Sequence, residues 1–171
     1  MAHPLRGGVV HPLEPPFRLA EPVRSLRNHI LDPIAPYSTM PFRYERAPDV
    51  SEQLQQIIDK LGFMHVPKNR VYCYRSYGSK AFNTIARVHS LPKIWQQALS
   101  EPAYYAVEVL SEQYDSLPND EKEKTLIHEL LHIPRSFGGG FRHHKDWVTK
   151  RRVEELHRVL KRSKTFPQVS S

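Results

Sequence analysis

Three polar side chains, His128, Glu129 and His132, interrupt an apolar segment of this chain. The apolar residues around them are Leu126, Ile127, Leu130, Leu131 and Ile133, and the charged run 121–124 comes before them. A helix places residues four positions apart on one face, so His128 and His132 can direct their imidazoles at one point. Burial of these groups is costly unless a partner satisfies them. We expect that partner to be a metal ion.

The same residues form the HExxH pattern of zinc peptidases, with two histidine ligands for Zn²⁺ beside a glutamate. The pattern predicts that Glu129 takes a proton from a metal-activated water and returns it to the leaving amine. The chain would then hydrolyse peptide bonds. The competing interpretation is that His128 and His132 are satisfied core histidines and that Glu129 is a surface carboxylate.

A catalytic zinc site needs a third protein ligand, and the sequence offers candidates downstream. The triple glycine at 138–140 allows the chain to turn back sharply. His143 and His144 follow it, and we favour a histidine because the return loop then has a clear purpose. The alternative ligand is a glutamate of the last helix, Glu154 or Glu155. The group that stabilises the oxyanion stays open among Tyr104, Tyr105, Arg142 and His157.

Prolines divide the chain into two parts. Eight of them stand in the first 41 residues, at positions 4, 12, 15, 16, 22, 33, 36 and 41. Each removes a backbone donor and disfavours helix at the preceding residue. We therefore expect residues 1–47 to form an extended or disordered arm, residues 48–164 to fold as one domain, and residues 165–171 to be a disordered tail.

Within the domain, the hydrophobic pattern predicts an α+β fold. Helices are expected near residues 49–61, 92–99, 119–132 and 144–162, and strands near 70–75, 84–89 and 104–110. Tyr105, Val107 and Val109 would share one face of the last strand. We expect a small sheet of about three strands packed with helices. The 104–110 strand would be an edge along which a substrate peptide could lie.

Charge and cysteine content limit the choice of partners and compartment. The net charge is +7, and basic residues gather toward the C-terminus. The C-terminal helix could contact nucleic acid, although a solvated helix face is the simpler interpretation. Cys73 is the single cysteine, and the sequence has no apolar run of 18 residues. We expect a cytoplasmic protein without a membrane span. Its oligomeric state stays open.

Several of these runs resemble the metallopeptidases of archaea and phages, a family of zincin-like peptidases. The likeness rests on Leu126–Pro134, the Phe137–Gly140 loop and Arg142-x-His144-Lys145. It extends back through three further runs, Ile85–Val88, Pro92–Gln96 and Tyr105–Val109. In all it covers roughly residues 43–160. It implies a zincin-like fold with a small mixed sheet, a Zn²⁺ cofactor and a peptide or protein substrate. The histidine two positions after the arginine is the third ligand in that pattern, which favours His144. His143 stands where the pattern has a small residue or proline, so it remains the alternative.

A looser resemblance to SprT-type proteases rests on the HExxH-to-histidine spacing and the basic tail. It implies a protease that acts on DNA-bound proteins. Two alternatives therefore stand beside the zinc peptidase. One is a DNA-associated, SprT-like protease, and the other is a non-catalytic binding module stabilised by zinc.

Overall fold

The computed structural model describes residues 42–165. Most of the expected arm (residues 1–41) and most of the expected tail (residues 166–171) lie outside the described residues. Among the described residues, no helix has both the length and the apolarity needed to cross a membrane.

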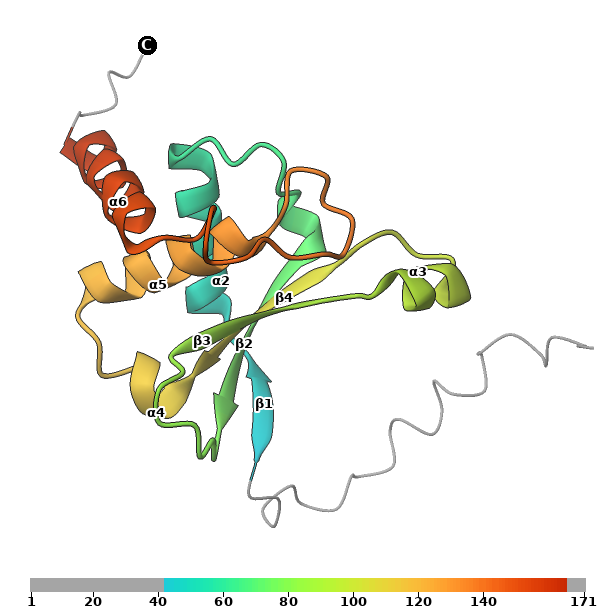
Figure 1. Ribbon diagram of the computed structural model, residues 1–171. Coiled ribbons are helices and arrows are strands. Elements are labelled where there is room, and N and C mark those ends of the chain that lie inside the picture. The colour runs from blue at the N-terminus through green and yellow to red at the C-terminus, as the bar shows by residue number, and fades with distance from the viewer. Residues whose placement is uncertain (1–41, 166–171) are drawn as a thin grey trace, which may run out of the picture. The chain divides into compact units, whose positions relative to one another are not determined.

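The structure confirms an α+β fold built on a small mixed sheet (Figure 1). The strands are β1 (Arg43–Arg46), β2 (Val71–Tyr77), β3 (Ala86–Ser90) and β4 (Tyr105–Leu110), in the order β1-β2-β4-β3. Strand β4 runs parallel to β2 and antiparallel to β3, while β1 is antiparallel to β2. As predicted, Tyr105, Val107 and Val109 share a buried face.

Strand β1 was not expected, because its residues lie in the segment 1–47 that was predicted to be an extended or disordered arm. The sheet therefore has four strands and not about three. All four β1 residues are exposed, so no apolar alternation marks the strand. Backbone pairing with β2 holds it, together with a guanidinium–ring contact in which Arg43 lies 4.1 Å from the centroid of Tyr77.

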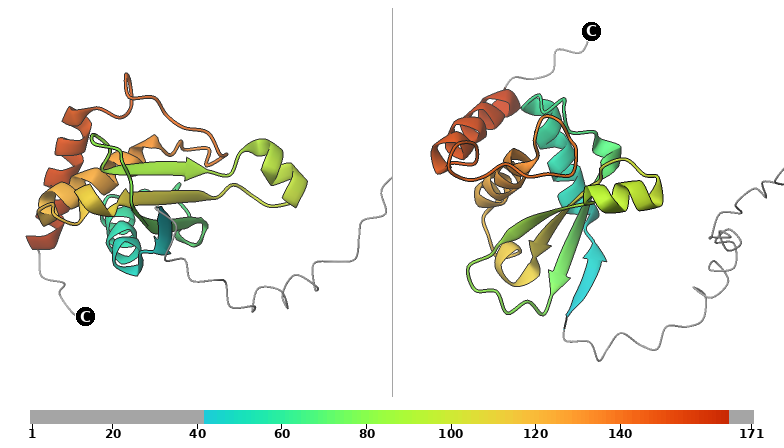
Figure 2. Two further views of the ribbon diagram at one scale, coloured as in Figure 1. Left: turned by 90° about the horizontal axis from the view of Figure 1, so that it is seen from below. Right: turned by 45° about the vertical axis from the view of Figure 1, so that its right-hand side comes forward.

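Three larger helices gather on one side of the sheet (Figures 1 and 2). They are α2 (Pro48–Lys60), α5 (Asn119–His132) and α6 (Lys150–Thr165). The shorter elements are the 3₁₀ turn η2 (Lys68–Arg70), α3 (Lys93–Leu99) and α4 (Ser111–Tyr114). Helix α3 lies beyond the ends of β3 and β4, apart from the other helices (Figure 2).

The last helix begins six residues later than expected, at Lys150 instead of His144. Thr149 explains this start, because its Oγ1 accepts a hydrogen bond of 3.2 Å from the backbone N–H of Arg152. A threonine in this position caps the exposed donors of a helix N-terminus. His144 is therefore part of the loop before α6, where helix geometry does not set the direction of its side chain.

The prediction that the 104–110 strand forms an edge of the sheet was also wrong. Strand β4 is internal, between β2 and β3, and the edge nearest α5 is β3. Strand β3 precedes β4 in the sequence, but β4 lies between β2 and β3 in the sheet and pairs with both. Hydrophobicity alone did not reveal this order, because no residue of β3 is buried and His89 is exposed.

Candidate metal centre

Helix α5 presents His128 and His132 on one face, as the four-residue spacing predicts. Asp120 and Glu121 lie in its first turn, where negative charge suits the helix dipole, and Pro134 follows its end. Leu126, Ile127 and Leu130 are fully buried against the core. The two imidazole Nε2 atoms lie 3.2 Å apart.

A return loop brings His144 to the same point. The backbone N–H of Arg142 donates to the carbonyl oxygen of His132 over 2.8 Å. In the other direction, His132 Nδ1 donates to the carbonyl oxygen of Arg142, also over 2.8 Å. This pair of bonds fixes the loop against the end of α5. As a result, His144 Nε2 lies 3.2 Å from His128 Nε2.

The glycine-rich part of the loop is held by three side chains from the sheet and α3. Ser90 donates to the carbonyl oxygen of Gly139, and Gln96 donates to that of Gly138. The Tyr105 hydroxyl accepts from the N–H of Gly139 and donates to the carbonyl oxygen of Gly140. Gly139 has φ +87°, and a Cβ there would lie 2.6 Å from the carbonyl oxygen of Leu91. The backbone conformation and the close contact both require glycine.

The three histidines fit the geometry of a metal site. Their ligand atoms all lie within 4.8 Å of one another. Two zinc–nitrogen bonds of about 2.05 Å in a tetrahedral arrangement place the nitrogens about 3.3 Å apart, close to the two Nε2 separations found here. Because His132 donates from Nδ1, its Nε2 carries a lone pair. A hydrogen bond donated by the other ring nitrogen commonly orients a metal-binding histidine.

Electrostatics keep the imidazoles of His128 and His132 in the neutral form that binds metals. Burial, followed by the neighbouring His132 and His144, lowers the pKa of His128 to about 4. Burial is also the main cause that lowers the pKa of His132. Near neutral pH both side chains are therefore unprotonated and able to act as ligands.

Glu129 lies beside the cluster with only 6% of its surface exposed. Burial raises the pKa of its carboxyl group to about 7, although a hydrogen bond from the backbone N–H of Val88 acts in the opposite direction. Glu129 and the three histidines line one cavity of about 1020 Å³. Val88 belongs to the edge strand β3, so the sheet holds this carboxylate in place. This contact leaves no pattern in the sequence, because it uses the backbone of Val88 and not its side chain.

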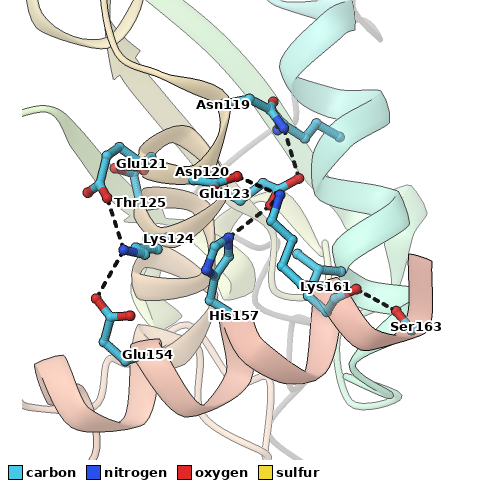
Figure 3. Close-up of polar contacts among 12 residues, drawn as sticks. Asn119, Asp120, Glu121, Glu123, Lys124, Thr125, Glu154, His157, Lys161 and Ser163 are labelled. Carbon is cyan, nitrogen blue, oxygen red and sulfur yellow. Dashed lines mark hydrogen bonds and ion pairs between the residues drawn. The ribbon is translucent and has the colours of Figure 1, made fainter. Parts of the chain in front are cut away.

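The alternative ligands lie outside the group of converging ligand atoms, although Glu154 lines the same cavity. His143 lines the same cavity, but it is not one of the three histidines whose ligand atoms converge. Glu154 forms an ion pair of 3.1 Å with Lys124, as Figure 3 shows. Glu155 pairs with Arg151 and Arg152 along α6.

Of the four side chains considered for the oxyanion, Arg142 alone lines the cavity. Its guanidinium lies 5.0 Å from the ring centroid of Trp147. The Tyr105 hydroxyl is engaged with the glycine-rich loop, and the Tyr104 hydroxyl donates to Glu101. His157 is buried against Glu123 between α5 and α6.

A second group of possible ligand residues, Asp120, Glu123 and His157, joins α5 to α6 (Figure 3). The ammonium group of Lys161 lies 2.5 Å from an oxygen of Asp120 and 3.1 Å from one of Glu123. His157 Nε2 lies 3.0 Å from the same carboxylate. A protein cation thus already occupies this cluster, and its role is to fasten the two helices together.

A mixed sheet that holds a buried glutamate beside three converging imidazoles has the architecture of a metal-dependent hydrolase. Comparison with known families agrees with this class. Residues 42–169 match the family described as "Putative phage metallopeptidase". Because the match covers most of the chain, the protein belongs to this metallopeptidase family. The family implies a metal ion and a peptide or protein substrate. No curated protein and no solved structure matches the chain.

Proposed function

We propose that this protein is a zinc-dependent peptidase in which His128, His132 and His144 bind the metal and Glu129 is the general base. The convergence of three imidazoles beside a buried carboxylate in one cavity supports this proposal. Imidazole ligands suit several transition metals, but three protein nitrogens with one open position are typical of catalytic zinc.

Bound zinc supplies Lewis-acid activation of water and of the substrate carbonyl. The protein supplies the proton transfers. In the metal-free protein, burial raises the pKa of the Glu129 carboxyl group to about 7, and a group with this pKa can both accept and release a proton near neutral pH. Val88 N–H holds the Glu129 carboxylate in place, so that it can accept a proton from water and pass it to the leaving amine.

The edge of β3 provides a template for an extended peptide. Leu110 N–H donates to Ile85 O, and Leu91 N–H donates to Tyr104 O. In an antiparallel ladder these groups alternate, so Ala86, Val88 and Ser90 direct their backbone groups away from β4. Val88 N–H is used by Glu129. We propose that a substrate adds itself as a further strand along the remaining outward groups.

Metal analysis and peptidase assays on matched variants test this function. Wild type should bind one zinc ion per chain and cleave an unfolded protein. Glu129→Gln should keep the zinc and lose the cleavage, whereas His144→Ala should lose both. If wild type and Glu129→Gln hold zinc equally and neither cleaves any peptide or unfolded protein, the enzyme proposal fails. The non-catalytic zinc module would then be the correct interpretation.

The DNA-associated alternative receives less support from helix α6. Arg151 and Arg152 pair with Glu155, and Lys161 contacts Asp120. Contact of this helix with nucleic acid remains a prediction, and a salt titration of DNA binding tests it. A cytoplasmic location also remains a proposal, supported by the single, buried Cys73.

A further inference from the structure

The face of the sheet opposite α2, α5 and α6 displays tyrosines. Side chains alternate along a strand, so the even-numbered positions of β2 and β4 point away from the buried odd-numbered ones. Tyr72 and Tyr74 on β2 and Tyr44 on β1 lie on this face, next to Tyr104, which directly precedes β4. The rings of Tyr72 and Tyr104 stack with their centroids 6.0 Å apart. Tyr44 keeps 55% of its surface exposed.

This face contains a cavity of about 300 Å³ lined by Tyr44, Tyr74, His89, Ala106 and Glu108. Glu108 is 1% exposed. His89 Nε2 lies 2.7 Å from Glu108 Oε2, while Glu108 Oε1 has no hydrogen-bond partner in the described part of the chain. The guanidinium of Arg87 is 3.7 Å from Oε1, which is an ion pair without a hydrogen bond. A buried acceptor without a hydrogen bond is costly, so a ligand that donates one would be favoured.

Positive charge borders the cavity. The guanidinium of Arg46 lies 4.9 Å from the ring centroid of Tyr72 and 5.0 Å from that of Tyr74. Arg87 lies on the opposite side, on β3. The site thus combines aromatic ring faces, one buried acceptor and two cationic groups.

We propose that this face binds single-stranded nucleic acid and that one base enters the cavity. The base stacks against the tyrosines and donates an N–H to Glu108 Oε1. Its phosphate pairs with Arg46, and a neighbouring base stacks on the Tyr72–Tyr104 pair. Every base has a π face, and all four bases carry N–H donors, so this recognition tolerates different sequences.

The charge of the site argues for a base in preference to a basic side chain of a protein partner. A lysine or arginine in the cavity would meet Arg46 and Arg87, and Glu108 is already paired with Arg87. A base brings a neutral donor, while its backbone brings the negative charge that Arg46 attracts. A paired duplex base cannot enter, because its Watson–Crick edge is already occupied.

Fluorescence anisotropy with a labelled oligonucleotide of about 12 residues tests the proposal, with the full chain as the protein. Tyr44→Ala should raise the dissociation constant at least about fivefold, because each stacked base contributes about 1–3 kcal/mol. Arg46→Ala should also raise it, because this variant lacks the cation that pairs with the phosphate. Glu108→Gln should also weaken binding, and circular dichroism checks that this buried variant folds.

Matched controls are available on the same domain. Arg43→Ala removes one positive charge from β1, as Arg46→Ala does, but the Arg43 side chain lies on the opposite face of the sheet. Phe82→Ala removes an aromatic ring that is 92% exposed elsewhere. Both controls should bind like the wild type. The duplex of the same sequence should bind more weakly than the single strand.

Four results would overturn the proposal. The first is no binding at low salt, and the second is equal losses in Arg46→Ala and Arg43→Ala. The third is complete displacement of the labelled oligonucleotide by a free nucleoside monophosphate at the same concentration as the oligonucleotide. That result would indicate a site for free nucleotides. The fourth is loss of binding in the α6 double variant Arg158→Ala/Arg162→Ala while Tyr44→Ala binds normally. None of these results depends on zinc or on peptide cleavage, so the outcome is independent of the proposed peptidase function.

Discussion

Glu129 has an ionisable carboxyl group at a position that disfavours charge. Its pKa is raised to about 7 by burial, whereas an unfolded glutamate titrates near 4.5. Between these values the unfolded chain loses its proton and the folded chain keeps it. Stability therefore falls as the pH rises through this window and stays low above it. The geometry suited to a general base is maintained at a cost in stability.

Replacement of Glu129 by Gln should remove this pH dependence in the metal-free protein. Gln can still accept the hydrogen bond from Val88 N–H but does not ionise. Relative to wild type, its unfolding free energy should gain up to about 3 kcal/mol between pH 4.5 and 7, since each pKa unit corresponds to about 1.4 kcal/mol. Urea unfolding with a chelator present measures this difference. A constant difference across that range contradicts the raised pKa.

The neighbouring histidines of the loop provide a second prediction at the same scale. His144→Ala should weaken zinc binding at least about a hundredfold, because even loss of a group that only orients a ligand costs 10- to 100-fold. His143→Ala should leave the affinity nearly unchanged. Competition with a chromophoric chelator measures both constants. A larger loss in His143→Ala would assign the third ligand to His143.

At the level of elements, the metal centre depends on the loop between α5 and α6. The end of α5 supplies His128 and His132, and β3 supplies Val88. The loop that carries His144 is fastened to both elements through Arg142 and Ser90. Because these contacts use backbone groups, a substitution in the loop can disrupt the site without changing any ligand.

Gly139→Ala is the substitution that tests this dependence. Its φ of +87° and the contact of a new Cβ with Leu91 O should cost about 1–3 kcal/mol and weaken zinc binding. Gly140→Ala is the matched control, because a Cβ there would meet nothing within 4 Å. Thermal unfolding and zinc titration of both variants measure the effect. Equal behaviour of the two alanine variants would show that the loop is not constrained at Gly139.

At the scale of the whole molecule, zinc should contribute directly to folding stability. A ligand that binds only the folded state at a thousand times its dissociation constant stabilises it by about 4 kcal/mol. The melting temperature should therefore rise with added zinc and fall with a chelator. Glu129→Gln should keep this shift and His144→Ala should lose it. An equal shift in all three proteins would place the zinc elsewhere.

Local patterns in the sequence predicted much of this molecule. The four-residue spacing of His128 and His132 fixed their common face, and the apolar residues between them required a buried helix. The alternation of Tyr105, Val107 and Val109 indicated a half-buried strand. These features depend on neighbours within one or two turns, so their physical causes are present in the sequence itself.

Contacts between distant segments were decided only by the tertiary structure. The exposed strand β1 has no apolar alternation, and the position of β3 at the edge depends on which strands pair. The convergence of His144 with His128 depends on hydrogen bonds between Arg142 and His132. The sequence by itself determined which side chains could form a metal centre. The tertiary structure determined which of them meet, because backbone pairing between remote segments leaves no local pattern in the sequence.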